Sequence, residues 1–78
     1  MVHKHEMIER IAAQTTLSKA QVSEVVSLWL EEMVHQLGQE GSRVELRGLG
    51  TFVTTGQNVR FRPGRRIKEA LSSGHRKP

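Results

Sequence analysis

Arginines that alternate with apolar residues along two short segments are the side chains best suited to chemistry in this sequence. The segments are residues 43–47 and 59–62. Successive side chains of a β-strand point to opposite faces, so the alternation places four arginines and one glutamate on one face of a sheet: Arg43, Glu45, Arg47, Arg60 and Arg62. Like charges directly opposite one another destabilise a sheet. Their concentration on one face therefore indicates an anionic ligand that neutralises them. The planar guanidinium group matches phosphate with two parallel hydrogen bonds, so we expect phosphate.

A second basic cluster follows directly along the chain. Gly64 allows a ligand to approach the backbone closely, and Arg65, Arg66 and Lys68 surround the first turn of a predicted helix. The free N–H groups of a helix start favour anions. The alternative is a solvated basic face that only keeps the protein soluble. We favour an anion-binding site because the sheet face and the helix start are both positively charged.

Other chemistry has little support. Residues 5–9 begin like a zinc-protease motif, but Glu9 stands where the second histidine is required. The chain has no cysteine, its serines fall into no recognisable triad, and Trp29 with Met33 is more typical of a core than of a cofactor site. We therefore expect no enzyme, no metal and no cofactor.

The elements that position the basic residues can be predicted from hydrophobic spacing. A short helix is expected over residues 3–14, although His3 is a weak cap, and a long helix over residues 19–37. Ser18 and Gln21 supply a capping box at the start of the long helix. Three antiparallel strands follow in residues 43–47, 51–54 and 59–62, with a tight hairpin at residues 55–58. A final helix is expected to begin at Pro63 and to end near Leu71.

The long helix is apolar around more than half of its circumference. A helix packed against one small core needs a narrower apolar stripe, so we expect a second subunit to cover the rest. A fully internal helix is the alternative, but 78 residues leave too little chain to surround it. The predicted dimer interface contains Val22, Val26, Trp29, Leu30, Met33, Leu37, Phe52 and Phe61.

Length and charge agree with this interpretation. The 78 residues allow one domain, expected over residues 1–71 with a flexible basic tail at residues 72–78, and so small a core needs support. Residues 1–41 carry three lysines and arginines against six glutamates, whereas residues 42–78 carry nine against two. This asymmetry predicts a polyanionic partner. We expect nucleic acid and no membrane, because no apolar run approaches the length of a membrane span. The N-terminus lacks the apolar stretch of a secretion signal, so we expect a cytoplasmic protein.

Three short stretches carry a resemblance to a known family. They are Leu17-Ser18-Lys19-Ala20, the run from Val44 to Phe52 that contains Gly48-Leu49-Gly50-Thr51-Phe52, and the run from Phe61 to Lys68 that begins Phe-Arg-Pro-Gly. In these the chain resembles the bacterial HU and integration host factor family. The resemblance implies an α+β fold that forms an intertwined homodimer. It consists of an N-terminal helical hairpin, a three-stranded antiparallel sheet and a short C-terminal helix.

The resemblance also implies DNA contacts on a basic saddle and at helix starts, and it adds Lys4 to the candidates. The full predicted DNA-binding set is Lys4, Arg43, Arg47, Arg60, Arg62, Gly64, Arg65, Arg66 and Lys68.

The chain departs from the family pattern between its last two strands. Family members carry a long arm there, whose proline wedges between base pairs, and only residues 53–58 fill that space here. We therefore expect an armless nucleoid protein that binds and condenses DNA through its phosphates, without sequence preference or sharp bending. The alternative is an interaction module that forms a heterodimer with a full-length HU-like or other nucleoid protein and modulates it.

Overall fold

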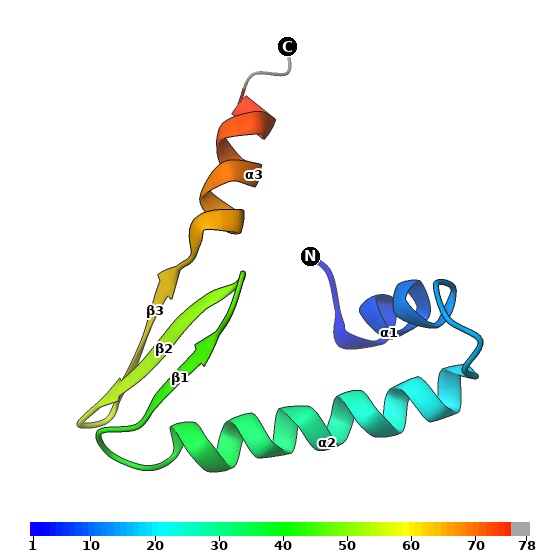
Figure 1. Cartoon of the computed structure of the whole chain (residues 1–78). Helices are drawn as coiled ribbons and strands as arrows, with labels where there is room; N and C mark the ends of the chain where they lie inside the picture. The colour runs from blue at the N-terminus through cyan, green and yellow to red at the C-terminus, as the bar shows by residue number, and fades with distance from the viewer. Residues whose placement is uncertain (76–78) are drawn as a thin grey trace. The chain divides into compact units, whose positions relative to one another are not determined.

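The computed structural model describes residues 1–75 as three helices and one antiparallel sheet, an α+β fold (Figure 1). The elements are α1 (Lys4–Ala12), α2 (Lys19–Leu37), β1 (Arg43–Leu46), β2 (Gly50–Thr55), β3 (Asn58–Pro63) and α3 (Arg65–His75). The chain divides into two compact units, Met1–Met33 and the part from Val34 onward. The predicted order of elements is confirmed, and α2 has the expected bounds. No helix among the described residues is both long and apolar enough to cross a membrane.

In the first unit, the start of α2 carries the predicted capping box. The backbone N–H of Gln21 donates to the Ser18 hydroxyl at 3.1 Å, and the backbone N–H of Ser18 donates to the Gln21 side-chain oxygen at 2.9 Å. Two N–H groups that the helix itself cannot satisfy therefore have acceptors. A Lys19–Glu9 ion pair at 3.3 Å joins this start to α1.

The α1 helix begins at Lys4 and is capped from within. The Glu6 carboxylate accepts a hydrogen bond from the backbone N–H of His3 at 2.8 Å. A carboxylate in the first turn also interacts favourably with the positive end of the helix dipole. Glu6 thus compensates for the weak capping residue that we noted at position 3.

Few side chains of the first unit are buried. Its buried apolar residues are Ile8, which is 6% exposed, and Val22, which is 4% exposed. By contrast, Val25 and Leu28 on α2 are 61% and 65% exposed. The single chain therefore leaves much of the apolar surface of α2 uncovered, as its wide apolar arc predicted.

In the second unit, the strands form a meander in the order β1-β2-β3, with both pairs antiparallel. The register places Val44 opposite Phe52 and Phe52 opposite Phe61. The rings of Phe52 and Phe61 lie 4.7 Å apart between centroids. These residues define one apolar face of the sheet, as the alternation predicted.

Gly50 lies where the sheet turns toward α3. Its φ is +153°, and a Cβ at this position would lie 2.3 Å from the carbonyl oxygen of Arg62. Glycine is required because any other side chain would force the β2 and β3 backbones apart.

Pro63 corrects one prediction. It is the last residue of β3 and pairs with Gly50, whereas we expected it in the first turn of the last helix. β3 is an edge strand, where a proline is tolerated because its missing N–H need not serve a neighbouring strand. The first helical residue is Arg65.

The hairpin between β2 and β3 is short. Thr55 pairs with Asn58, so Gly56 and Gln57 alone form the loop. Gly56 has a φ of +60°, and Gln57 does not have a positive φ. This pattern fits a type II′ turn, which suits the twist of antiparallel strands.

Thr54 attaches the sheet to the end of α2. The side chain is 6% exposed, and its hydroxyl donates to the carbonyl oxygen of Leu37 at 2.7 Å. The backbone N–H of Thr54 also donates to the carbonyl of Ser42 at 2.9 Å. One otherwise unsatisfied carbonyl of the helix end thus finds a donor on the central strand.

α3 is longer than predicted. It continues past Leu71 through Ser72 and Ser73 to His75, where we expected a tail to have begun. Neither serine prevents helix formation, and residues 72–75 contain no proline that would end it. The rest of the predicted tail, residues 76–78, lies outside the described residues.

Candidate nucleic-acid interface

The face of the sheet opposite the phenylalanines is basic. The register aligns Arg43, Val53 and Arg60 in one row across the sheet and Glu45, Thr51 and Arg62 in the next. Arg47 lies in the turn directly after the end of β1, and it lines a depression together with Glu45. We call this surface the outer face; its members are Arg43, Glu45, Arg47, Thr51, Val53, Thr55, Asn58, Arg60 and Arg62.

The arginines of the outer face do not stand directly opposite one another. β2 lies between the two charged strands and contributes the uncharged side chains of Thr51, Val53 and Thr55. Neighbouring strands are about 4.8 Å apart, so the charged side chains of β1 and those of β3 are separated by roughly 9.5 Å. That separation is close to the Debye length at physiological salt, which weakens the repulsion. Our argument from direct repulsion was therefore wrong, although the register confirms the shared face for Arg43, Glu45, Arg60 and Arg62.

The sheet arginines are exposed and available for a ligand. Arg43, Arg47, Arg60 and Arg62 are all classed as exposed. Within residues 1–75, neither of the two ion pairs found involves any of them. An anion can therefore bind these groups without displacing a carboxylate partner.

The start of α3 adjoins this face. The backbone N–H of Gly64 donates to the carbonyl of Leu49 at 2.8 Å, which holds the helix start against the β1–β2 bend. The first helical hydrogen bond runs from the N–H of Lys68 to the carbonyl of Gly64. The earlier N–H groups of the first turn have no acceptor within the helix, so they point a partial positive charge outward.

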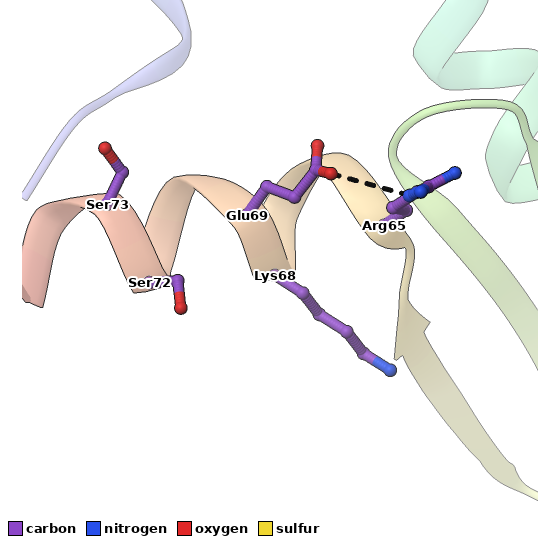
Figure 2. A pocket seen from close by; sticks show the side chains of 5 residues that line it. All are labelled: Arg65, Lys68, Glu69, Ser72 and Ser73. Atoms are coloured by element: carbon purple, nitrogen blue, oxygen red, sulfur yellow. Dashed lines mark ion pairs between the residues drawn. The ribbon is translucent and has the colours of Figure 1, made fainter.

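The cations of α3 differ in availability (Figure 2). The Arg65 guanidinium forms an ion pair with the Glu69 carboxylate one turn later, at 3.4 Å. The Lys68 side chain extends on the other side of the helix, where Ser72 also points. Arg65 must share its charge with Glu69, whereas Lys68 has no ion-pair partner among the described residues.

Arg66 lies against the β1–β2 bend. A Cβ built on Gly48 would lie 3.2 Å from Cδ and 3.7 Å from one terminal nitrogen of Arg66. Arg66, Ile67 and Ala70 line one shallow depression together with residues 47–49. The stem of Arg66 thus packs on the bend, and part of its role is to position α3.

Lys4 is the predicted contact that belongs to the other unit. It is the first residue of α1 and is exposed. The structure therefore gathers every predicted DNA-binding residue except Lys4 on the outer face and the start of α3.

The predicted dimer residues differ in how exposed they are within one chain. Val22 is 4% exposed within its own chain, so it belongs to the core of the first unit and offers little surface to a partner. Trp29, Leu30 and Phe61 are 48%, 37% and 42% exposed. The other four are partly exposed: Val26, Met33, Leu37 and Phe52. The most exposed apolar side chains of α2, at positions 25, 28 and 34, were not in the predicted set.

Sequence reasoning also missed the floor of the outer face. This floor is the central strand β2, where Thr51 and Thr55 place hydroxyl groups between the charged side chains of β1 and β3. Val53 lies between the two threonines on the same face. The alternation of β2 carried this signal, because threonine recurs at the second and sixth residues of the strand on one face. The Arg65–Glu69 pair was likewise foreseeable from its helical spacing.

The chain matches a known protein family over most of its length. The family model described as bacterial DNA-binding protein matches residues 2–60. The beta subunit of integration host factor from Vibrio atlanticus is 34% identical over 92 aligned positions, which cover 91% of this chain and 97% of that subunit. The alpha subunit from Pseudomonas putida is 40% identical over 65 residues, which cover 83% of this chain and 62% of that subunit.

A solved structure is also similar. A variant of HU from Thermotoga maritima superimposes with a TM-score of 0.81 at 27% sequence identity. The match covers 90% of this chain and 99% of that one. Fold and sequence together define a class of non-enzymatic, nucleoid-associated proteins that bind DNA and dimerise. The chain belongs to this bacterial DNA-binding protein family, which includes HU and integration host factor.

Proposed function

We propose that this protein binds DNA as a homodimer through phosphate contacts on the outer face and at the start of α3, without sequence preference. The observation that carries the proposal is the register, which collects Arg43, Arg60 and Arg62 around an uncharged central strand. Contacts to phosphate fix position and orientation but do not identify bases. The protein would act in the cytoplasm, on the nucleoid.

The short hairpin supports a mode of binding without sharp bending. A two-residue loop joins β2 to β3, and its residues, Gly56 and Gln57, offer no apolar wedge. Kinking a duplex by intercalation requires such a wedge to unstack a base step. The alignment with the Vibrio subunit spans 92 positions, more than the 78 residues of this chain, so that relative contains residues without a counterpart here.

The homodimer is supported by apolar surface that the single chain leaves open. Among residues 1–73, the apolar side chains classed as buried are Ile8 and Val22, and no side chain is less than 2% exposed. Phe61 and Val59 on the apolar face of the sheet are 42% and 54% exposed. Covering such surface is the main favourable contribution to obligate association.

The proposal is tested by binding to an end-labelled duplex, measured by fluorescence transfer between its ends across a salt series. With about 4–6 phosphates neutralised, log K should fall against log salt with a slope of roughly −4 to −5. Unchanged transfer efficiency on binding would agree with an unbent duplex. Affinity that is independent of salt would contradict the phosphate mode, and a large gain in transfer would show that bending needs no arm.

A matched pair of variants locates the contact. Replacing both Arg60 and Arg62 by glutamine removes four cations from each dimer, so it should reduce the magnitude of the salt slope by up to about 4, equally on unrelated sequences. Arg10→Gln removes an exposed cation of α1 and should leave the slope unchanged. A smaller salt slope in the Arg10 variant, or an unchanged slope in the double variant, would place the interface elsewhere.

The exposed apolar face of α2 also fits a second function, in which this subunit pairs with a full-length HU-like protein and modulates it. Such a role does not require the basic outer face. Gel filtration of the protein alone, with a duplex, and with a full-length relative distinguishes the two. Exclusive heterodimer formation would favour the second function, whereas a stable homodimer that shifts with the duplex would favour the first.

A further inference from the structure

The outer face continues into the start of α3 as one basic track. One depression is lined by Arg43, Val53, Thr55, Arg60, Phe61 and Arg62. The next is lined by Thr51, Arg62, Gly64 and Arg65, together with Glu45 and others. Arg62 lines both, so the two depressions adjoin. The track therefore follows β2 from the hairpin toward the first turn of α3.

The dimensions of this track suit a single linear chain of anions. The charged side chains of β1 lie about 9.5 Å from those of β3, on the other side of β2. Along β3, Arg60 and Arg62 are about 6.8 Å apart. The floor is narrow and uncharged and carries the hydroxyl groups of Thr51 and Thr55. A chain of phosphates lying along β2 would meet Arg43 on one side, Arg60 and Arg62 on the other, and hydroxyl donors beneath, with Glu45 as the one carboxylate beside it.

Nothing found on the track requires a base. The sheet carries two aromatic residues, Phe52 and Phe61, and the register pairs them on the face opposite the arginines. The rings of Phe52 and Phe61 pack against each other on the opposite face, and Trp29 lies on α2. Binding of single-stranded nucleic acid commonly depends on bases stacked on aromatic rings, and the track offers no such platform.

We propose that the track is a site for linear phosphate chains as such, so that inorganic polyphosphate is a second ligand that competes with DNA. This inference rests on the proposed function, because both ligands would occupy the same arginines. It goes further in assigning the bases and sugars no part in binding at the track. A phosphate polymer would then displace the protein from DNA.

In the experiment, the 78-residue protein is titrated with a short linear inorganic polyphosphate, and binding is measured by isothermal titration calorimetry. A parallel competition uses anisotropy of a labelled duplex. Polyphosphate should bind the protein directly and displace the duplex at constant ionic strength. Replacing both Arg43 and Arg60 by glutamine should weaken polyphosphate binding by at least about tenfold, because charge-assisted bidentate contacts are lost. Arg10→Gln should leave it unchanged.

Poly-glutamate serves as the comparison polymer, since its carboxylates hang on flexible side chains rather than forming the chain itself. Equal affinity for poly-glutamate would overturn the inference by showing that only net charge matters. Duplex binding that polyphosphate does not displace would overturn it and leave the proposed function intact. Polyphosphate binding without any duplex binding would contradict both the competition with DNA and the proposed function.

Discussion

At the scale of single residues, Glu45 stands out on the outer face. It lies in the same cross-strand row as Arg62, with Thr51 between them, and is exposed. No ion pair involves Glu45 within residues 1–75. In the phosphate contact that we propose, a carboxylate without a cation partner repels the ligand and lowers its affinity.

We therefore expect Glu45→Gln to strengthen duplex binding by a few fold, which corresponds to about 0.5–1 kcal/mol for one exposed charge. The measurement is the duplex dissociation constant at two salt concentrations, with the larger gain at the lower one. Glu24→Gln on α2 is the matched control, because it changes net charge equally outside the outer face. Weaker binding by the Glu45 variant would mean that this carboxylate orients an arginine.

At the scale of elements, the local signals differ in what they support. The Ser18 and Gln21 capping box fixes the start of α2, and the loop of Gly56 and Gln57 fixes the register of β2 with β3. The hairpin matters for binding because its register determines which residues of β3 reach the outer face. A one-residue slip would exchange Arg60 and Arg62 for Val59 and Phe61.

Replacing Gly56 by alanine should destabilise the protein by about 1 kcal/mol, because φ +60° is unfavourable for a residue with a Cβ. Nothing lies within 4 Å of a Cβ at this position, so the cost would come from the backbone and not from a clash. The free energy of unfolding in urea measures it. Replacement by asparagine, which tolerates this conformation better, should cost less; an equal cost would contradict the explanation.

Ser18→Ala should lower the free energy of unfolding by roughly 1 kcal/mol, because the N–H of Gln21 loses its acceptor. Urea denaturation again provides the measurement. Ser27→Ala, in the middle of α2, is a suitable control, since alanine favours the helix interior and no capping contact is lost. A Ser18 variant as stable as the wild type would show that the capping box contributes nothing.

At the scale of the whole molecule, the decisive feature is apolar surface that one chain cannot bury. Trp29 is 48% exposed and is the single tryptophan of the sequence. Its emission therefore reports directly on whether a partner covers α2.

We expect tryptophan emission to shift to longer wavelength on dilution, and the thermal midpoint to rise with protein concentration, because folding and association are linked. Analytical ultracentrifugation over the same concentrations should show dimers giving way to monomers. Leu28→Asp, at a side chain that is 65% exposed in one chain, should move the midpoint of this transition to higher concentration. Emission and sedimentation that do not change with concentration would contradict a reversible dimer.

Much of this protein follows from local sequence. Alternation assigned Arg43, Arg47, Arg60 and Arg62 to one face, and capping signals set the bounds of α2, because strand period and helix ends depend on residues a few positions apart. The same local rules left Pro63 ambiguous, since proline is tolerated both in a first helical turn and at a sheet edge. They also placed the end of α3 too early.

The tertiary structure decided what depends on contacts between distant residues. The position of β2 between the charged strands separates their arginines, and the close approach of β2 to the backbone of Arg62 requires a glycine at position 50. It also showed that Val22 is covered by its own chain while much of α2 is not. The period of each element determines which of its residues share a face. Strand pairing and burial depend on contacts between elements, so only the tertiary structure determines them.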